Sequence, residues 1–311
     1  MSTSSQARPR MVGESTPPAP LTSESGKKNK KHVVAHLCLL ALVCYFLVPV
    51  WWLFVASTKD TQGLFSGEGA LWFQGFHLFD NLKSLVTYNG GEYLRWFGNS
   101  VLYAFAGGLG ATVISVLAGY GFAKFAFRGR TVMFALLLGS VMVPLTALVI
   151  PTFILMSYFG MTDTIWAVIL PSLLSPFGVY LMRVYASAAV PDELLDAARV
   201  DGAGEFRTFF QVALPLMRPA VITVALLSIV GTWNNYFLPL AVLSSSKLFP
   251  LPVGIGLWSA LAASNNSGGA GGGSLWSLII VGSLVSVVPL IIAFLSLQKY
   301  WQGGLSVGSL K

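Results

Sequence analysis

Residues 191–215 read PDELLDAARVDGAGEFRTFFQVALP, a polar stretch within a sequence that is otherwise strongly apolar. A helix is predicted from about 191 to 200, since a proline and two acidic residues suit its first turn. Gly202 and Gly204 then favour a sharp turn over a continued helix. A second short helix is expected next, closed by Pro215. The stretch therefore predicts an amphipathic helix pair at a membrane surface.

The two helices are expected to present different kinds of side chain. The second carries its apolar residues on one side, namely Phe206, Phe209, Phe210 and Val212. The region of the turn exposes small residues, namely Ala197, Ala198, Gly202 and Ala203. Small residues let the backbone of another protein approach closely, so the stretch is interpreted as a docking loop.

Seven positions of this loop follow a regular spacing: Asp196, Ala197, Ala198, Gly202, Val212, Leu214 and Pro215. The spacing resembles the EAA signature, E-A-A-x3-G-x9-I-x-L-P, of permease subunits of binding-protein-dependent ABC importers. Asp196 stands in place of Glu and Val212 in place of Ile. The resemblance implies that the loop is a cytoplasmic coupling helix, and that these seven residues seat it in a cleft of a separate ATP-binding subunit.

The composition excludes an ordinary soluble domain. Of the 311 residues, 55% are hydrophobic and 10% are charged, which indicates a multispan membrane protein. Cys38 and Cys44 lie six residues apart in one apolar segment and would not face each other on a helix, so no disulfide or metal pair is expected. The three histidines have no ligand spacing. Neither a metal site nor a catalytic site is predicted.

Six apolar segments meet the requirement of roughly 20 residues for a membrane crossing. They are residues 33–56, 100–122, 132–155, 164–185, 220–243 and 275–297. The first segment follows four lysines and is too long for the core of a cleaved signal peptide, so it is expected to remain as an anchor. The prediction is an all-α membrane protein with six transmembrane helices and both termini on one side.

Positive charge predicts the orientation, because Lys and Arg concentrate in cytoplasmic segments. With a cytoplasmic N-terminus, every Lys and Arg is cytoplasmic except Lys59, Lys83, Arg95 and Lys247. The expected plan is a disordered cytoplasmic tail at 1–32, a first transmembrane helix at 33–56, an external loop at 57–99, a permease core at 100–298 with a cytoplasmic coupling loop at 186–219, and a cytoplasmic tail at 299–311. The expected location is a bacterial plasma membrane.

Three further patterns concern helix packing. Small residues recur at every fourth position of the second span, at Gly107, Ala111, Ser115, Gly119 and Ala123. They indicate close packing either within the chain or with another subunit. Prolines are expected to bend the third and fourth spans, at Pro144, Pro151, Pro171 and Pro176. The aromatic residues of 57–99 are interpreted as an interfacial belt rather than a ligand site.

The fifth span contains a polar and aromatic cluster, made of Trp233, Asn234, Asn235 and Tyr236. Unpaired amides are costly in hydrocarbon, so these side chains are expected to face neighbouring helices or a wet cavity. Two interpretations stay open, direct contact with a sugar and hydrogen bonding across helices. The cluster resembles the Trp-Asn segment in the fifth core helix of sugar permeases, which implies a substrate pathway at this position.

Two more segments follow the fifth span. The segment 244–274 is expected to be an external loop with a flexible, glycine-rich tip. The ending QKYWQGGLSVGSLK, residues 298–311, resembles the Q-(R/K)-Y-x-x-x-G-L-x-x-G-x-x-K tail of MalG-like subunits of the maltose-type permease family. In that family the tail lies against the ATPase dimer.

These features predict a transport subunit rather than an enzyme. No phosphate-binding G-x-x-x-x-G-K-[ST] loop occurs, so ATP and Mg are expected on a partner ATPase and no cofactor on this chain. The interpretation is half of a sugar pathway. The resemblance implies as partners a second permease subunit in a heterodimer, an ATP-binding subunit dimer and an extracytoplasmic sugar-binding protein, with membrane lipid around them and no nucleic acid.

Two other functions are considered. A permease of the same family for a non-sugar solute remains an alternative. An ion-coupled secondary transporter is disfavoured, because such proteins need ionisable residues within the spans and almost none lie there.

Overall fold

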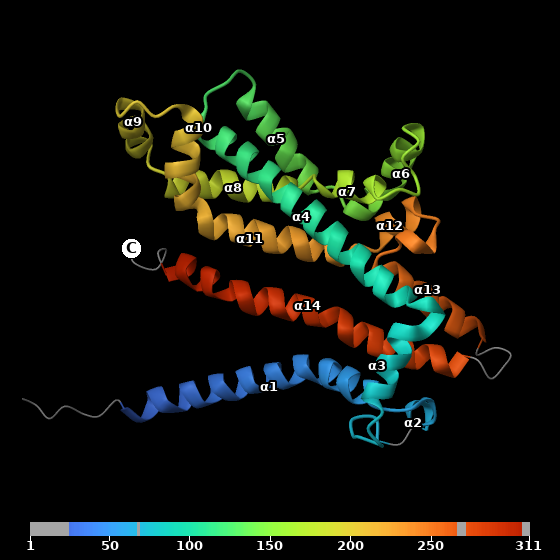
Figure 1. Ribbon diagram of the computed structural model, residues 1–311. Coiled ribbons are helices and arrows are strands. Elements are labelled where there is room, and N and C mark those ends of the chain that lie inside the picture. The colour runs from blue at the N-terminus through green and yellow to red at the C-terminus, as the bar shows by residue number, and fades with distance from the viewer. Residues whose placement is uncertain (1–24, 67–68, 266–271, 307–311) are drawn as a thin grey trace, which may run out of the picture. The chain divides into compact units, whose positions relative to one another are not determined.

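A computed structural model describes residues 25–66, 69–265 and 272–306, without the side chains of 25–32, 265, 272–274 and 299–306 (Figure 1). Every regular element in these ranges is a helix. The chain divides into two units, residues 1–50 and 51–311.

The first unit contains, in its described part, the beginning of α1 (Ser25–Ser57). The helix starts within the tail predicted for 1–32, because the Lys-rich residues before Val33 are themselves good helix formers. Residues 1–24 of that predicted tail lie outside the described residues. Cys38 and Cys44 are free thiols, as expected.

The second unit begins with the last part of α1 and continues through the rest of the chain. Its elements are α2 (Thr61–Phe65), α3 (Leu78–Thr87), η1 (Tyr88–Gly90), α4 (Glu92–Lys124), α5 (Arg130–Val141), η2 (Leu145–Leu148), α6 (Val149–Tyr158), α7 (Trp166–Ser172), α8 (Pro176–Ala189), α9 (Asp192–Val200), α10 (Glu205–Thr208), the π-helical segment η3 (Phe209–Ala213), α11 (Leu214–Trp233), α12 (Phe237–Val242), η4 (Ser246–Leu248), α13 (Leu251–Asn265) and α14 (Gly272–Ser306).

Five helical stretches of the described residues are long and apolar enough to cross a membrane: Val33–Ser57, Glu92–Lys124, Trp166–Ala189, Glu205–Trp233 and Leu275–Gln298. A sixth is obtained when α5 and the helical stretch Leu145–Tyr158 are counted together, although they are bent by 99°. Pro144 lies at this bend in an extended conformation, with φ −61° and ψ 128°. The third predicted span is therefore a broken one, with the break at one of the prolines expected to bend it.

Small residues of α4 settle how this helix packs. A Cβ on Gly119 would collide with Met182 of α8, and a Cβ on Gly107 would lie 2.8 Å from Ser172 of α7. Ser115 is fully buried on the same face. The stripe predicted for the second span therefore packs within the chain, because the absent side chains are what let α4 approach α7 and α8.

The aromatic residues near the start of α4 form a core rather than an interfacial belt. Tyr93 and Trp96 are buried, and their rings pack on Trp258 of α13 with centroids 6.2 Å and 4.8 Å away. The Tyr93 hydroxyl donates a hydrogen bond to the Gly282 carbonyl of α14 at 2.7 Å. The belt interpretation was wrong for these residues because α13, a helix inside the loop predicted for 244–274, covers them. Most of the predicted glycine-rich tip, residues 266–271, lies outside the described residues.

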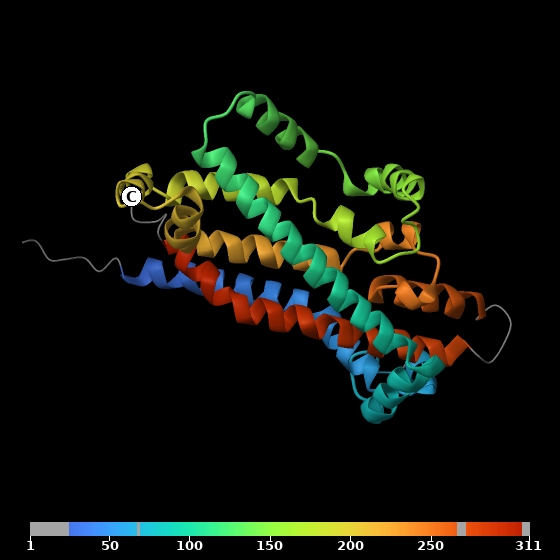
Figure 2. The same cartoon turned by 45° about the horizontal axis from the view of Figure 1, so that its top comes forward.

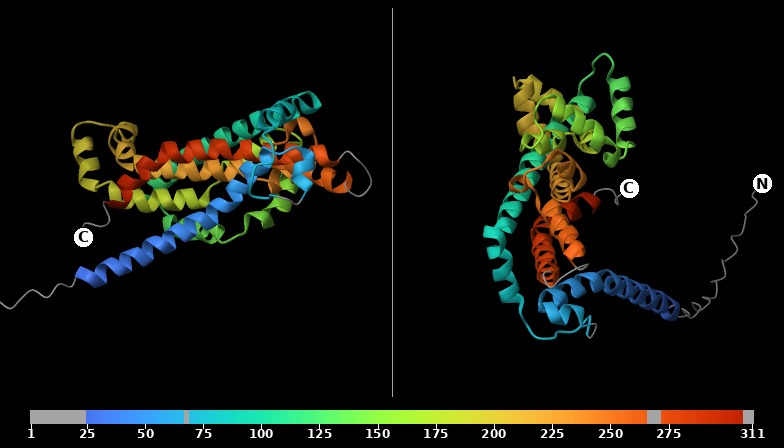
Figure 3. Two further views of the ribbon diagram at one scale, coloured as in Figure 1. Left: turned by 90° about the horizontal axis from the view of Figure 1, so that it is seen from below. Right: turned by 90° about the vertical axis from the view of Figure 1, so that its right-hand side faces the viewer.

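The second unit has two distinct ends along its long helices (Figure 2). The helices α9 and α10 and the connection from α4 to α5 lie at one end, and α3 and α13 lie at the other (Figure 3). The predicted docking loop is therefore separated from the α3–α13 end by the length of the apolar helices.

Candidate functional site

The turn between α9 and α10 is a Schellman motif centred on Gly202. The Ala203 N–H donates to the Ala198 carbonyl at 2.9 Å, and the Gly202 N–H donates to the Arg199 carbonyl at 3.0 Å. Gly202 has φ +82°, a left-handed conformation that costs a residue with a side chain roughly 1–2 kcal/mol. The glycine of the signature is thus required by the geometry that ends α9.

Helix α9 has one buried side and one exposed side. Leu195 is buried in a cluster that includes Tyr120 of α4 and Met217 of α11. Asp196 and Ala197 are exposed on the other side of the helix. The first helix of the pair is therefore amphipathic as predicted, and its apolar side anchors it to the long helices.

The aromatic residues of the second helix do not share one side. Phe209 is buried against the Tyr120 ring, with centroids 4.9 Å apart, whereas Phe206 is 84% exposed and Phe210 is 57% exposed. The π-helical segment η3, which begins at Phe209, changes the direction of successive side chains, and a sequence read with regular helical spacing cannot detect this. Phe206 thus joins Val200, 88% exposed, as an apolar residue available to a partner.

Pro215 does not end the second helix, contrary to prediction. It lies in the first turn of α11, and the helical stretch Glu205–Trp233 passes through it without interruption. A proline is tolerated in this place because the π-helical segment η3, directly before it, departs from the regular hydrogen-bond ladder of an α-helix. The predicted docking loop is therefore continuous with a candidate spanning helix.

The seven signature residues divide into two groups. Asp196, Ala197 and Gly202 are exposed, and Ala198 is half-buried beside them. Val212 and Leu214 pack against the cluster around Leu195, and Pro215 is half-buried next to them. The first group can meet a partner, whereas the second group holds the loop to the body of the protein.

Ion pairs reinforce the loop. Lys124, at the end of α4, contacts Asp192 at 2.7 Å, and its side chain is only 7% exposed. Arg199 contacts Asp196 at 2.8 Å and Glu205 at 2.9 Å. The hydrogen bond from Lys124 holds the pKa of Asp192 below its usual value, and the pairs with Glu205 and Asp196 raise the pKa of Arg199. Asp192, Asp196 and Glu205 are thus each paired with a basic side chain of the loop or of α4.

The predicted pathway cluster lies at a break between α11 and α12, not inside a continuous helix. Trp233 is buried at the end of α11, edge to face with Phe97. Asn234 is exposed and its side-chain amide donates to the Val230 carbonyl of its own helix at 3.0 Å. Asn235 and Tyr236 are half-buried. Within the described residues, the Asn234 side chain therefore bonds to its own helix rather than to another one, and Trp233 belongs to the core.

No metal centre accompanies these residues: within the described ranges, no group of three His, Cys, Asp or Glu side chains could hold an ion.

Residues 92–302 match the family described as the binding-protein-dependent transport system inner membrane component. The chain belongs to this family.

Relatives of this inner membrane component are permease proteins. The chain is 36% identical to the arabinooligosaccharides transport system permease protein AraQ of Halalkalibacterium halodurans, over 88% of this chain and 93% of that protein. It is 30% identical to the lactose transport system permease protein LacG of Rhizobium radiobacter, over 89% and 96%. It is 28% identical to the sn-glycerol-3-phosphate transport system permease protein UgpE of Pectobacterium atrosepticum, over 88% and 95%.

A solved structure has the same fold. A bacterial ABC transporter involved in the import of the acidic polysaccharide alginate contains a chain with a TM-score of 0.72 and 23% identity, which covers 91% of this chain and 99% of that one. The protein is therefore a multi-pass permease subunit of an ABC importer rather than an enzyme, and the ATPase is a separate subunit.

Proposed function

We propose that this chain forms half of the translocation pathway of an ATP-driven sugar importer, and that α9 and α10 seat on the ATP-binding subunit. The observation that carries the proposal is the exposure of Val200 and Phe206 beside the turn at Gly202. Large apolar side chains that are exposed on a polar hairpin are typical of a protein-binding surface. Asp196 and Ala197 would complete this docking surface.

The attachment of the hairpin supports a coupling role. Leu195 packs among residues of α4, α8 and α11, and Lys124 ties α9 to the end of α4. A displacement of α9 by the ATPase would therefore be passed to three long helices as a rigid-body movement. The pathway would alternate between inward-open and outward-open states as ATP binds and is hydrolysed on the partner.

A sugar is the proposed cargo, supported by the names of AraQ and LacG among the relatives. Asn234, Asn235 and Tyr236 could contact it, because amides and an aromatic face suit a sugar. A phosphorylated polyol is the second candidate, since UgpE is also similar. Uptake of labelled arabinooligosaccharide and of glycerol 3-phosphate by the assembled importer in proteoliposomes distinguishes the two cargoes.

The proposed assembly contains a second permease subunit, an ATP-binding subunit dimer with ATP and Mg, and an extracytoplasmic sugar-binding protein. A similar solved transporter was crystallised with a periplasmic protein that binds an alginate pentasaccharide, which supports the last partner. In a bacterial plasma membrane, the basic residues favour cytoplasmic N- and C-termini. The cytoplasmic coupling loop at 186–219, the permease core at 100–298 and the cytoplasmic tails remain part of this proposal. The tail predicted for 1–32 and the loop predicted for 57–99 are shorter than expected, because α1 begins at Ser25 and α4 begins at Glu92.

Replacement of one exposed side chain tests the docking role. We expect Phe206→Asp to reduce both the amount of ATPase that co-purifies and the rate of uptake, because it places a charge in an apolar contact. The control is Phe79→Asp, whose side chain is 74% exposed on α3 at the opposite end and whose replacement should leave ATPase co-purification unchanged. Undiminished ATPase co-purification and uptake with Phe206→Asp would contradict the proposal.

A further inference from the structure

Arg183 is the one charged residue in the helical stretch Trp166–Ala189. Charged side chains in membrane spans are costly and normally have a partner. The Nε atom of Arg183 is buried and has no hydrogen-bond partner, and the ion pairs of the described residues do not include this side chain. The guanidinium carbon lies 3.7 Å from the centre of the Phe134 ring, which orients the group without neutralising it.

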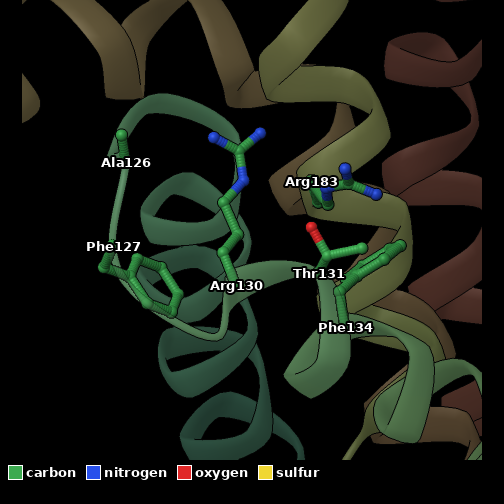
Figure 4. A pocket seen from close by; sticks show the side chains of 6 residues that line it. All are labelled: Ala126, Phe127, Arg130, Thr131, Phe134 and Arg183. Atoms are coloured by element: carbon green, nitrogen blue, oxygen red, sulfur yellow. The ribbon is translucent and has the colours of Figure 1, made fainter.

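A second arginine, Arg130, lies with Arg183 in the lining of one cavity. Arg183 of α8 and Arg130 at the start of α5 line a cavity of about 320 Å³, together with Ala126, Phe127, Thr131 and Phe134 (Figure 4). Arg130 donates one hydrogen bond, from Nη1 to the Phe125 carbonyl at 3.3 Å. Arg130 and Thr131, the first two residues of α5, line the cavity, so the positive end of this helix lies beside it. The lining contains two cations, a hydroxyl and no carboxylate.

This lining suits an anion with several oxygen atoms. A guanidinium presents paired N–H donors that match phosphate geometry, and its hydrogen bonds to a charged acceptor are stronger than neutral ones. A phosphate group would supply the acceptor that Arg183 Nε lacks. The Thr131 hydroxyl would be a further donor.

Exposed apolar side chains follow on α5, the helix that contributes Arg130, Thr131 and Phe134 to the cavity lining. Val132, Met133 and Leu136 follow Arg130 and are 64%, 53% and 69% exposed. Arg183 lies six residues before the end of α8, about 9 Å along the helix axis, within reach of a membrane surface for a long side chain. A ligand with an anionic head and apolar chains would match both surfaces.

We propose that the cavity between α5 and α8 binds the phosphodiester of an anionic phospholipid, with Arg130 and Arg183 on the phosphate and the acyl chains along α5. The site lies at the end of the second unit that carries α9 and α10 (Figure 1). A bound lipid would hold α5 against α8 near the proposed docking surface.

Native mass spectrometry of the assembled importer tests the site. The complex is exchanged into detergent with equal amounts of dioleoylphosphatidylglycerol and dioleoylphosphatidylcholine, and retained lipid is counted. We expect preferential retention of phosphatidylglycerol, and about a tenfold loss with Arg183→Gln or Arg130→Gln, as expected for one charged hydrogen bond. Arg183→Lys should retain an intermediate amount, because it keeps the charge and loses the paired donors.

The matched control is Arg128→Gln, which removes the same charge from an exposed residue outside the cavity lining and should leave retention unchanged. Equal retention by Arg128→Gln, Arg130→Gln and Arg183→Gln would overturn the proposal.

Competition with inorganic phosphate distinguishes the two sources of the phosphate group, a lipid headgroup and free phosphate. Binding of inorganic phosphate that depends on Arg183, without preferential lipid retention, would overturn the lipid assignment. If the Arg183 variants do not assemble, lipid retention by Arg130→Gln is compared with that by Arg128→Gln.

Discussion

The guanidinium of Arg199 donates to both carboxylate oxygens of Glu205, at 2.9 Å and 3.3 Å, across the turn that contains Gly202. A pair with two hydrogen bonds restrains the angle between the groups as well as their distance. The same guanidinium holds Asp196 at 2.8 Å. The acidic residue of the signature is therefore oriented by the side chain that also joins α9 to α10.

Substitution of Gly202 should destabilise the turn between α9 and α10 because of its backbone conformation alone. A Cβ at Gly202 or at Gly204 would meet no atom within 4 Å, but only Gly202 has a positive φ. We expect Gly202→Ala to destabilise the turn by roughly 1–2 kcal/mol and to reduce ATPase co-purification. Gly204→Ala should have little effect, and Gly202→Asn should retain more binding than Gly202→Ala, because Asn tolerates this conformation. Equal binding by the two alanine variants would contradict this explanation.

The ion pair between Lys124 and Asp192 should make the stability of the folded protein depend on pH. The pKa of Asp192 is lowered in the folded protein, so its contribution is present above the unfolded value of about 3.8 and is lost as the pH falls through the folded value. In thermal unfolding, Asp192→Asn should lower the melting temperature near neutral pH, and the difference from wild type should disappear in strong acid. The control is Asp201→Asn, an exposed residue outside the ion pairs of the described chain, which should show no such difference.

The packing of α4 on α8 should be sensitive to one methyl group. We expect Gly119→Ala to destabilise the protein by about 1–3 kcal/mol, because the new Cβ would collide with Met182 and approach the Arg183 backbone nitrogen to 2.8 Å. Gly121→Ala, two residues away, meets no atom within 4 Å and should stabilise the helix by up to about 1 kcal/mol. Denaturant unfolding of the purified complex measures both changes. The interpretation fails if Gly119→Ala is as stable as wild type.

The pathway cluster should separate into structural and functional members. Trp233→Ala is expected to cost about 3–5 kcal/mol, since it removes a buried aromatic side chain. Asn234→Ala removes an exposed side chain with one local hydrogen bond, so its effect on stability should be about 1 kcal/mol or less. Reduced uptake by Asn234→Ala or Asn235→Ala at normal expression would support contact with the cargo. Unchanged uptake kinetics in both would leave only a structural role.

Local patterns predicted the local features of this protein. Apolar length indicated the spans, and Pro144 indicated the bend between α5 and the helical stretch after it. Acidic residues at its start and Gly202 at its end were sufficient to predict α9. The second helix was predicted less well, because a π-helical segment begins at Phe209, whose ring packs against Tyr120, and regular helical spacing does not predict such a segment.

The sequence by itself determined the membrane class, the apolar segments of the candidate spans and the turn at Gly202, because apolar length and a left-handed glycine are properties of neighbouring residues. Only the tertiary structure decided that Phe206 is exposed while Phe209 is buried, that Trp96 lies under α13, and that Arg130 and Arg183 border one cavity. These relationships join residues from different helices, and their burial and pairing arise only when the helices pack.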